Sequence, residues 1–586
     1  MLENIKNKFA NKFSTLFDKE KIISKVKTFI LKPTEFQITV YFLIITSIAC
    51  FFISWVNNKF TVPLGGDYYM QEMNFIYNFY DDFHHFFKTG EFIFFDTSPT
   101  FGIDNIGGNA FYGLFNPFNL ILLIFPRNSI MTIQGIEMAL KLVLAGVFYH
   151  KYLGAFNFSE KSKRIGCIAF AFSGYCFSYL WFHFIDSVCF LPLILLGIEN
   201  VISRRDPRVL LIGFFLNGMT NYFFFVVFII GGFFYAVFRL LQTWKKRSST
   251  ENFASLGIGI LSFIGGMCLS AITLIPGLLI AKTMPRVSTG DTYFENIKNA
   301  TSFKEMLVAI FTFPSSHTHN YVTPLLNFLF MADGCYYSNL LNVNWYDNFQ
   351  ASLYATTPLL LLFFVGIIYS FRKKKISYII AVLLNLLLVL SPIGYYLFTG
   401  FNVGYARFFI LPLSFMIVFD LIILENRRAI ARYYLDISFV IVVILEAVSC
   451  YLMIYQVNYK PSYFTGTEWD ERMYLILFSM IYLVVCYLVM RFFFHKKKLN
   501  VILPVICSLD VIVMANATIY LHGTVSLDSI AGGLNNVNEE TKIVELLKQC
   551  QDENEYYRIY NTSADRNNDN ISMKEGYNGV ASFHSI

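Results

Sequence analysis

Residues 37–56 read QITVYFLIITSIACFFISWV, a run of 20 positions without an Asp, Glu, Lys or Arg. An α-helix needs about 20 mostly apolar residues to cross the hydrocarbon core of a bilayer. Similar runs recur along the 586 residues, of which 55% are hydrophobic and only 15% charged, whereas about 25% of the residues in a soluble domain are charged. The sequence therefore predicts an all-α polytopic membrane protein.

About thirteen such runs make up one expected transmembrane domain over 37–521. Their approximate positions are 37–56, 131–150, 163–181, 186–202, 209–220, 221–242, 253–282, 351–371, 376–392, 405–424, 434–456, 472–492 and 499–521. The stretch 209–242 is ambiguous, because polar residues interrupt it between Asn217 and Asn221. It forms either two short helices or one helix and a re-entrant half.

Lysines and arginines gather on one side of this topology. Eight lysines lie in residues 1–36, and the other basic clusters follow the second, fourth, sixth, eighth, tenth and twelfth runs. Because cytoplasmic loops are enriched in Lys and Arg, we expect a multi-pass protein of the cell membrane with a cytoplasmic basic segment at 1–36 and an extracellular C-terminus. The net charge of +6 lies in these short clusters, so no nucleic-acid partner is expected.

Three long segments fall on the expected outer side, at 57–130, 283–350 and 522–586. The first loop holds seven Asp and Glu residues against three Lys and Arg residues. The last segment contains a helix-like stretch, EETKIVELLKQCQ, and a strand-like stretch, EYYRIY. We expect it to be a small extracellular α/β segment, or one that is truncated.

The first loop opens with PLGGDYYMQEMNFIYN (63–78), in which one carboxylate, Asp67, follows two glycines. Glycines allow the backbone to turn tightly and to approach a ligand closely. A carboxylate in that position can act as a general base toward an attacking hydroxyl. Alternatively, Asp67 only caps a helix that starts near Tyr68, since Asp is a favoured N-cap residue. The two roles are compatible.

The same loop continues with FFDTSPTFGIDNIGGNAFYGLFNPFNLILLIFP (94–126), whose glycines predict irregular backbone. Asp104 and Asn105 add a second acid and an amide. The apolar stretch 118–126 is too short to span a bilayer, so we expect it to dip into the membrane surface.

Several of these stretches together resemble the bacterial YfhO-like membrane protein family. They are GGDYYMQ (65–71), FGIDNIGGNAFYGLFNPFNLILLIFP (101–126), WFHFIDSVCFLPLILLGIE (181–199), LIPGLLIAKTMPR (274–286) and GYARFFILPLSF (404–415). The resemblance implies a glycosyltransferase of the GT-C fold. Such an enzyme works in contact with the membrane lipid and takes a sugar from a polyprenyl-phosphate-linked donor. It also implies an envelope polymer acceptor, such as teichoic acid of a Gram-positive bacterium. The family usually has a larger extracellular C-terminal domain, which leaves recognition of the acceptor open.

The resemblance also implies roles for particular residues. Asp67 matches the position of the catalytic acid of GT-C enzymes, where it would deprotonate the acceptor hydroxyl. The candidate substrate-binding residues are Gln71, Asp104, Asn105, Tyr112, His183, Asp186, Arg286 and Arg407.

Five of these candidates also have a simpler interpretation. The two arginines lie on the expected outer side, where they bind the donor phosphate through the fixed fork of the guanidinium or extend to lipid headgroups. His183 and Asp186 fall in a short outer turn, where a polar pair is often only solvated. Tyr112 either stacks on a sugar or belongs to the interfacial aromatic belt.

No cofactor is expected. The ten cysteines show no CxxC pair or Cys/His spacing typical of a zinc site. The HTH tripeptide at 317–319 has i, i+2 spacing and no third ligand nearby, which is a weak signal. Some GT-C enzymes hold a divalent ion beside the acid, and Asp104 is placed to help hold one, but the sequence does not support it.

A transporter or flippase for a lipid-linked sugar is the main alternative, and a scaffold for envelope assembly is a third. A transporter is expected to carry ionisable residues at mid-membrane depth and internal repeats. The spans hold few charges and no repeat is evident, which favours the enzyme. The main charged residues in the runs are Glu137, Lys141, Glu199, Asp420, Glu446 and Asp510.

Overall fold

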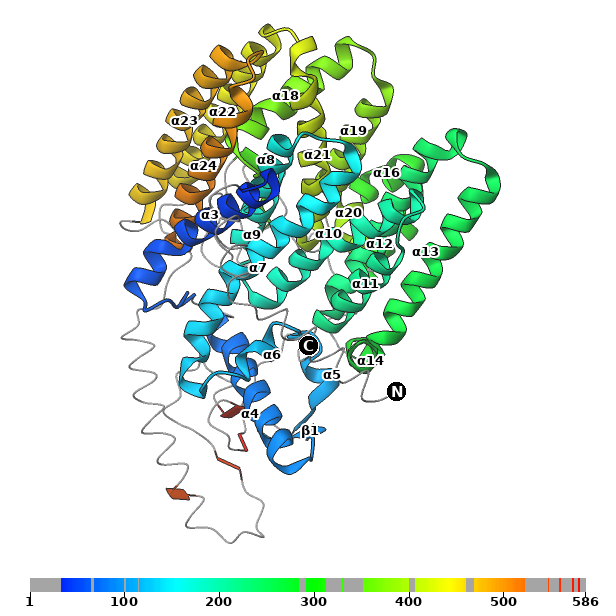
Figure 1. Cartoon of the computed structure of the whole chain (residues 1–586), viewed down its shortest axis with the longest axis vertical. Helices are drawn as coiled ribbons and strands as arrows, with labels where there is room; N and C mark the ends of the chain where they lie inside the picture. Colours follow the sequence, from blue (N-terminus) through cyan, green and yellow to red (C-terminus); the bar gives the residue numbers. More distant parts are fainter. Residues whose placement is uncertain are drawn as a thin grey trace, which may run out of the picture.

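The computed structural model describes residues 33–64, 68–99, 102–113, 115–283, 291–311, 328–329, 351–399, 406–459 and 468–521, and four residue pairs at 546–547, 558–559, 572–573 and 578–579. These residues are mostly helical (Figure 1). A short antiparallel hairpin pairs β1 (Phe95–Asp96) with β2 (Ile103–Asp104). The predicted helical membrane class is therefore confirmed.

The apolar helices form a bundle. Its first half consists of α3 (Glu35–Asn57), α7 (Ile130–Leu153), α8 (Glu160–Ala171), α9 (Gly174–Ser178), α10 (Phe182–Ile202), α11 (Arg208–Thr220), α12 (Tyr222–Thr243), α13 (Ser249–Leu269) and α14 (Ala271–Thr283). Its second half consists of α18 (Thr357–Arg372), α19 (Ile376–Leu390), α20 (Pro392–Phe398), α21 (Ile410–Asn426), α22 (Tyr433–Tyr459), α23 (Glu468–Phe493) and α24 (Leu499–Leu521). The last of these, α24, packs against the first, α3.

Every expected apolar run coincides with one helix or with a pair of consecutive helices. Among the described residues, seven helices are long and apolar enough to cross a membrane, or eight if α19 and α20, which meet at a bend of 82°, form one span. The count of thirteen spans therefore stays a prediction. The run expected at 163–181 is not one helix, because α8 ends at Ala171 and α9 starts at Gly174. The ambiguous stretch 209–242 is two helices, α11 and α12.

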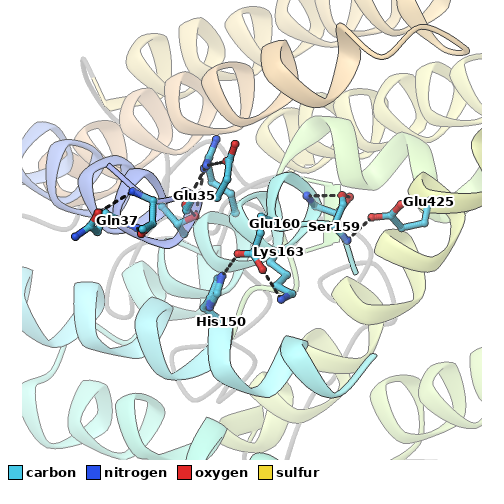
Figure 2. Close-up of polar contacts among 11 residues, drawn as sticks. Glu35, Gln37, His150, Ser159, Glu160, Lys163 and Glu425 are labelled. Carbon is cyan, nitrogen blue, oxygen red and sulfur yellow. Dashed lines mark hydrogen bonds and ion pairs between the residues drawn. The ribbon is translucent and has the colours of Figure 1, made fainter. Parts of the chain in front are cut away.

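Polar contacts gather several helix ends at one end of the bundle (Figure 2). Glu160, at the start of α8, pairs with His150 near the end of α7 at 2.9 Å. The backbone N–H of Ser159 donates to Glu425 Oε1, near the end of α21, at 2.8 Å. Glu35, in the first turn of α3, belongs to the same group. Because α3 starts and α7 finishes here, the loop between them lies at the opposite end of the bundle.

That loop builds a small subdomain of its own at the lower edge of Figure 1. Its elements are the π-helical turn η1 (Tyr68–Glu72), α4 (Met73–Thr89), the β1–β2 hairpin, α5 (Asn105–Asn109), α6 (Asn119–Leu122) and the 3₁₀ turn η2 (Arg127–Ser129). Gly102 and Gly113 have φ angles of +94° and +75°, as the expected irregular backbone requires. Gly107 lies in α5 instead, where a Cβ atom would approach Ile280 Cδ1 of α14 to 2.5 Å.

The other two long segments, which the sequence predicts to lie outside, are described only in part. The segment 283–350 contains α15 (Asp291–Lys298) and α16 (Phe303–Phe311). In 522–586, Ile559 of the strand-like EYYRIY stretch pairs with Gly579 in a parallel bridge. The rest of the predicted C-terminal segment lies outside the described residues.

Close packing of α10 against α11 depends on glycines. A Cβ atom at Gly197 of α10 would lie 2.4 Å from Leu210 Cα of α11, and one at Gly213 of α11 would lie 2.9 Å from the backbone N of Ile194. Membrane helices use small residues in this way, since close backbone approach maximises van der Waals contact in a solvent as apolar as the helices.

We expect Gly197→Ala to destabilise the protein by about 1–3 kcal/mol, because the added methyl meets backbone rather than a flexible side chain. The measurement is the thermal unfolding of the detergent-solubilised protein. Gly257→Ala in α13 is the matched control, since a Cβ atom there meets nothing within 4 Å. An unfolding temperature as high for Gly197→Ala as for Gly257→Ala would contradict the proposed role of this glycine.

Candidate functional site

Two polar side chains at the start of α10 point into the protein. His183 and Asp186 are one helical turn apart, so they lie on the same face, and their exposed fractions are only 2% and 0%. The alternative that this pair is merely solvated is therefore wrong. Each side chain contacts a different neighbour from another part of the chain.

His183 pairs with a carboxylate from the first loop. Its Nδ1 lies 2.8 Å from Oε1 of Glu72, the last residue of η1. The backbone N–H of Phe182 donates to Oε2 of the same carboxylate at 3.3 Å. π-Helical turns are rare and are found frequently at functional sites. Glu72 is not among the site residues predicted from the sequence. Its position directly after Gln71 was the only feature of the sequence that pointed to it.

Gln71 is part of the same arrangement. The hydroxyl of Tyr112 donates to Gln71 Oε1 at 2.9 Å. The Tyr112 ring stacks on Phe75 with centroids 3.9 Å apart and lies 5.6 Å from the His183 ring. Both Gln71 and Tyr112 are buried. A packed and hydrogen-bonded Tyr112 does not behave as a residue of the interfacial belt.

Asp186 pairs with a lysine inside the bundle. Lys141 Nζ of α7 lies 2.8 Å from Asp186 Oδ1 and 4.0 Å from Glu137 Oε2. Asn116 of the first loop donates its amide N–H to the second Asp186 oxygen. Lys141 is fully buried, and Glu137 is 3% exposed. Two carboxylates thus share one ammonium group, and ionisable residues inside a membrane domain usually have a functional role.

The polar group continues along α7 toward the loop. Both side-chain oxygens of Glu137, and both polar atoms of the fully buried Gln134, form no hydrogen bond with the described residues. Burial, together with the nearby carboxylates of Glu72 and Glu137, raises the pKa of Tyr68 above its ordinary value. Tyr68 also meets the Phe182 ring with centroids 5.8 Å apart. Tyr68, at the start of η1, is therefore close both to the Glu72–His183 pair and to the group of Lys141, Asp186 and Glu137.

Arg407 precedes α21, in the 3₁₀ turn η6 (Ala406–Phe409). Its guanidinium lies over the rings of Phe184 and Phe223, at 4.9 Å and 5.0 Å from their centroids, and 5.8 Å from that of Phe111. Such cation–π contacts hold an arginine in place, and the planar fork of N–H donors of a guanidinium suits a phosphate or a carboxylate. Phe111 and Phe184 also contact the His183 ring, at 5.0 Å and 4.5 Å.

Five of the nine predicted site residues thus come together: Gln71, Tyr112, His183, Asp186 and Arg407. Asp104 and Asn105 make their contacts elsewhere in the first loop. Asp104 is exposed and caps α5, accepting from the backbone N–H groups of Ile106 and Gly107 at 3.0 Å and 3.3 Å. Asn105 donates to Asp82 at 2.6 Å.

The remaining predicted residues are not described. Asp67, Arg286 and the tripeptide at 317–319 lie outside the described residues. Tyr68, which follows Asp67 directly in the chain, is 2% exposed. The catalytic acid predicted from the sequence is therefore the immediate chain neighbour of the buried group around η1.

The bundle and its buried polar group define a polytopic helical membrane protein with a candidate site at the end that carries the first loop. The sequence profile of the bacterial membrane protein YfhO matches residues 38–335 and 337–586. Because this match extends over most of the chain, the protein belongs to the YfhO family. Comparison with curated proteins finds none that matches the chain.

Proposed function

We propose that the protein is a GT-C glycosyltransferase that moves a sugar from a polyprenyl-phosphate-linked donor to a polymer of the cell envelope, such as a teichoic acid, on the outer face of the membrane. The observation that carries this proposal is the pair of buried contacts made by Glu72 with His183 and by Gln71 with Tyr112. Gln71 and Glu72 belong to η1, the turn that follows Asp67 in the chain. A second support is Arg407, which shares its aromatic neighbours with His183.

The reaction needs a base at the acceptor and a cation at the donor. Asp67 takes the proton of the acceptor hydroxyl while that oxygen forms a bond to the anomeric carbon. The bond from that carbon to the phosphate oxygen breaks with its electron pair, which leaves polyprenyl phosphate. Arg407 stabilises the phosphate as its negative charge grows. The Glu72–His183 pair holds η1 against α10.

The test of this function uses the purified protein in liposomes that contain a polyprenyl-phosphate-linked sugar, with a teichoic acid polymer outside. A mass increase of the polymer by one or more sugar residues, together with release of polyprenyl phosphate, supports the proposal. In cells, a deletion strain is expected to lose a sugar substituent of its surface polymer and to regain it on complementation. A polymer of unchanged composition in both assays would contradict it.

We expect Arg407→Met to lower kcat/KM for the donor by about 10–100-fold, because a hydrogen bond to a charged group contributes about 1.5–3 kcal/mol. Arg407→Lys is expected to recover part of this loss, since Lys keeps the charge but not the planar fork. Arg372→Met is the matched control, because Arg372 also lies over an aromatic ring, that of Tyr433, at 5.9 Å. Equal losses for Arg407→Met and Arg372→Met would show that Arg407 only supports packing.

The second candidate function is a transporter or flippase for a lipid-linked sugar. The buried group of Lys141, Asp186 and Glu137 favours it, because such groups inside a membrane domain often mark a transport path. The same liposomes separate the two functions. A transporter would move the donor between leaflets without cleaving it, whereas the transferase consumes the donor only when the acceptor is present.

A further inference from the structure

The first loop contains a buried polar cluster that the proposed reaction does not use. We define the loop cluster as Asn78, Asp82, Asp96, Ser98, Asn105 and Asn109. Each of these residues is at most 9% exposed. They come from three places in the loop, namely α4, the β1 strand with the residues after it, and α5.

The two carboxylates of the loop cluster share one amide group. Asn78 Nδ2 lies 3.3 Å from Asp82 Oδ2 and 3.0 Å from Asp96 Oδ2. Asn105 donates to the same Asp82 oxygen at 2.6 Å. The backbone N–H of Ser98 donates to Asp96 Oδ1 at 2.8 Å. Two acids from separate elements therefore converge on one point.

This convergence leaves negative charge without a positive partner. No Lys, Arg or His of the described residues forms an ion pair with Asp82 or Asp96, and the adjacent Asp81 is paired with Arg127 at 2.8 Å. The two carboxylates accept hydrogen bonds only from neutral amide and backbone N–H groups of the described residues. Burying an ionised carboxylate is costly, and a cation bound between the two would offset that cost.

A second observation favours a cation. Asn109 Oδ1 and Ser98 Oγ are buried and accept or donate no hydrogen bond among the described residues. The Asn109 amide lies inside the loop cluster, because its Nδ2 donates to Asn105 Oδ1 at 2.5 Å. An amide that turns about its terminal bond presents oxygen in place of nitrogen. Ser98 is in contact with Asp96, whose Oδ1 accepts its backbone N–H. Carboxylate, amide and hydroxyl oxygens are the ligands that a hard cation prefers.

We infer that the loop cluster binds a hard divalent cation of the Ca²⁺ class, with Asp82 and Asp96 as the charged ligands and the amide and hydroxyl oxygens of the cluster as neutral ones. Among the described residues no group of three or more His, Cys, Asp or Glu side chains is arranged to hold a metal, so a softer ion such as Zn²⁺ is not favoured. Mg²⁺ gives up its water reluctantly and needs octahedral geometry, so it should bind more weakly.

The cation would fasten the loop that carries part of the candidate site. Asn105 and Asn109 belong to α5, and Phe111 and Tyr112 follow directly. The carbonyl of Ser98 accepts a hydrogen bond from the backbone N–H of Gly579 at 2.8 Å, which links the C-terminal segment to the same place. A bound ion would thus connect α4, β1 and α5 without taking part in the chemistry.

The experiment measures thermal unfolding of the full chain in detergent, with EDTA or with about 1–10 mM CaCl₂. We expect Ca²⁺ to raise the unfolding temperature by several degrees, and MgCl₂ to have a smaller effect. The shift should saturate with a Kd of about 10⁻⁴–10⁻³ M, the range of extracellular sites. Asp82→Asn and Asp96→Asn should each abolish it.

Glu91→Gln, an exposed acid of the same loop, is the matched control and should keep the full shift. Terbium luminescence, with competition by Ca²⁺, measures binding to the unmodified protein even if a variant fails to fold. No Ca²⁺-dependent shift and no terbium binding in the unmodified protein would overturn the inference. The same holds if Asp82→Asn and Asp96→Asn retain the full shift. None of these outcomes depends on sugar transfer.

Discussion

Asp67→Asn is expected to lower the rate of sugar transfer by about 10²–10⁴-fold, which is the usual contribution of a positioned general base. The amide has nearly the shape of the carboxylate but cannot accept the acceptor proton. Asn also caps helices about as well as Asp, so the substitution keeps any capping role and removes only the basic one. The measurement is the rate of transfer in the liposome assay, with the unfolding temperature recorded for each variant.

The control for this substitution is Glu91→Gln, which removes an exposed acid from the same loop and should leave the rate unchanged. In cells, the deletion strain complemented with the Asp67→Asn gene should show the same surface polymer as the uncomplemented strain. A folded Asp67→Asn protein with normal transfer would mean that Asp67 is a cap and that the base lies elsewhere. Glu72, paired with His183, would then be the next candidate to test.

Lys141→Met is expected to destabilise the protein by about 3–5 kcal/mol, because it leaves Asp186 as a buried charge without its partner. Thermal unfolding in detergent, or the yield of folded protein if the variant does not survive purification, measures the effect. Both side chains are fully buried, so water cannot compensate for the loss.

The double variant Lys141→Met/Asp186→Asn tests the cause. It removes the two charges of the closer pair and keeps an acceptor for the Asn116 amide, while the more distant Glu137 remains, so a large part of the lost stability should return. Arg208→Met is the matched control, because the ion pair of Arg208 with Asp206 is exposed and should contribute little to stability. A double variant as unstable as the single one would show that the charge balance of this pair is not what stabilises the bundle.

Several features of the fold follow from the sequence over short distances. The apolar runs predicted helices wherever the structure describes them, since the length and hydrophobicity of a run are local properties. The break at Asn221 was visible as an amide in an apolar stretch, and the side chain of Asn221 does cap α12 through the N–H groups of Phe223 and Phe224. The number of helices that cross the membrane was less predictable, because the run expected at 163–181 is divided between α8 and α9, which are short and largely buried inside the bundle.

The candidate site was predictable as a set of residues and not as an arrangement. Glu72 and His183 are 111 positions apart, and nothing in the sequence pairs them. In the sequence, Asp104 and Asn105 are adjacent polar residues in the same glycine-rich stretch. In the structure, Asp104 caps α5 at the surface and Asn105 is buried against Asp82. Which of them is buried depends on how the loop folds back onto α4.

By itself, the sequence determined that this chain is a helical membrane protein of the YfhO family with its acidic first loop at the end opposite several basic clusters. Composition, run length and motif spacing carry that information, because a bilayer sets the same length and charge requirements for each span separately. Only the tertiary structure decided that Glu72 meets His183, that Lys141 neutralises Asp186, and that Arg407 lies against Phe184. Those contacts depend on which helix faces pack together, and the energy of a buried charge depends on the partner that packing supplies.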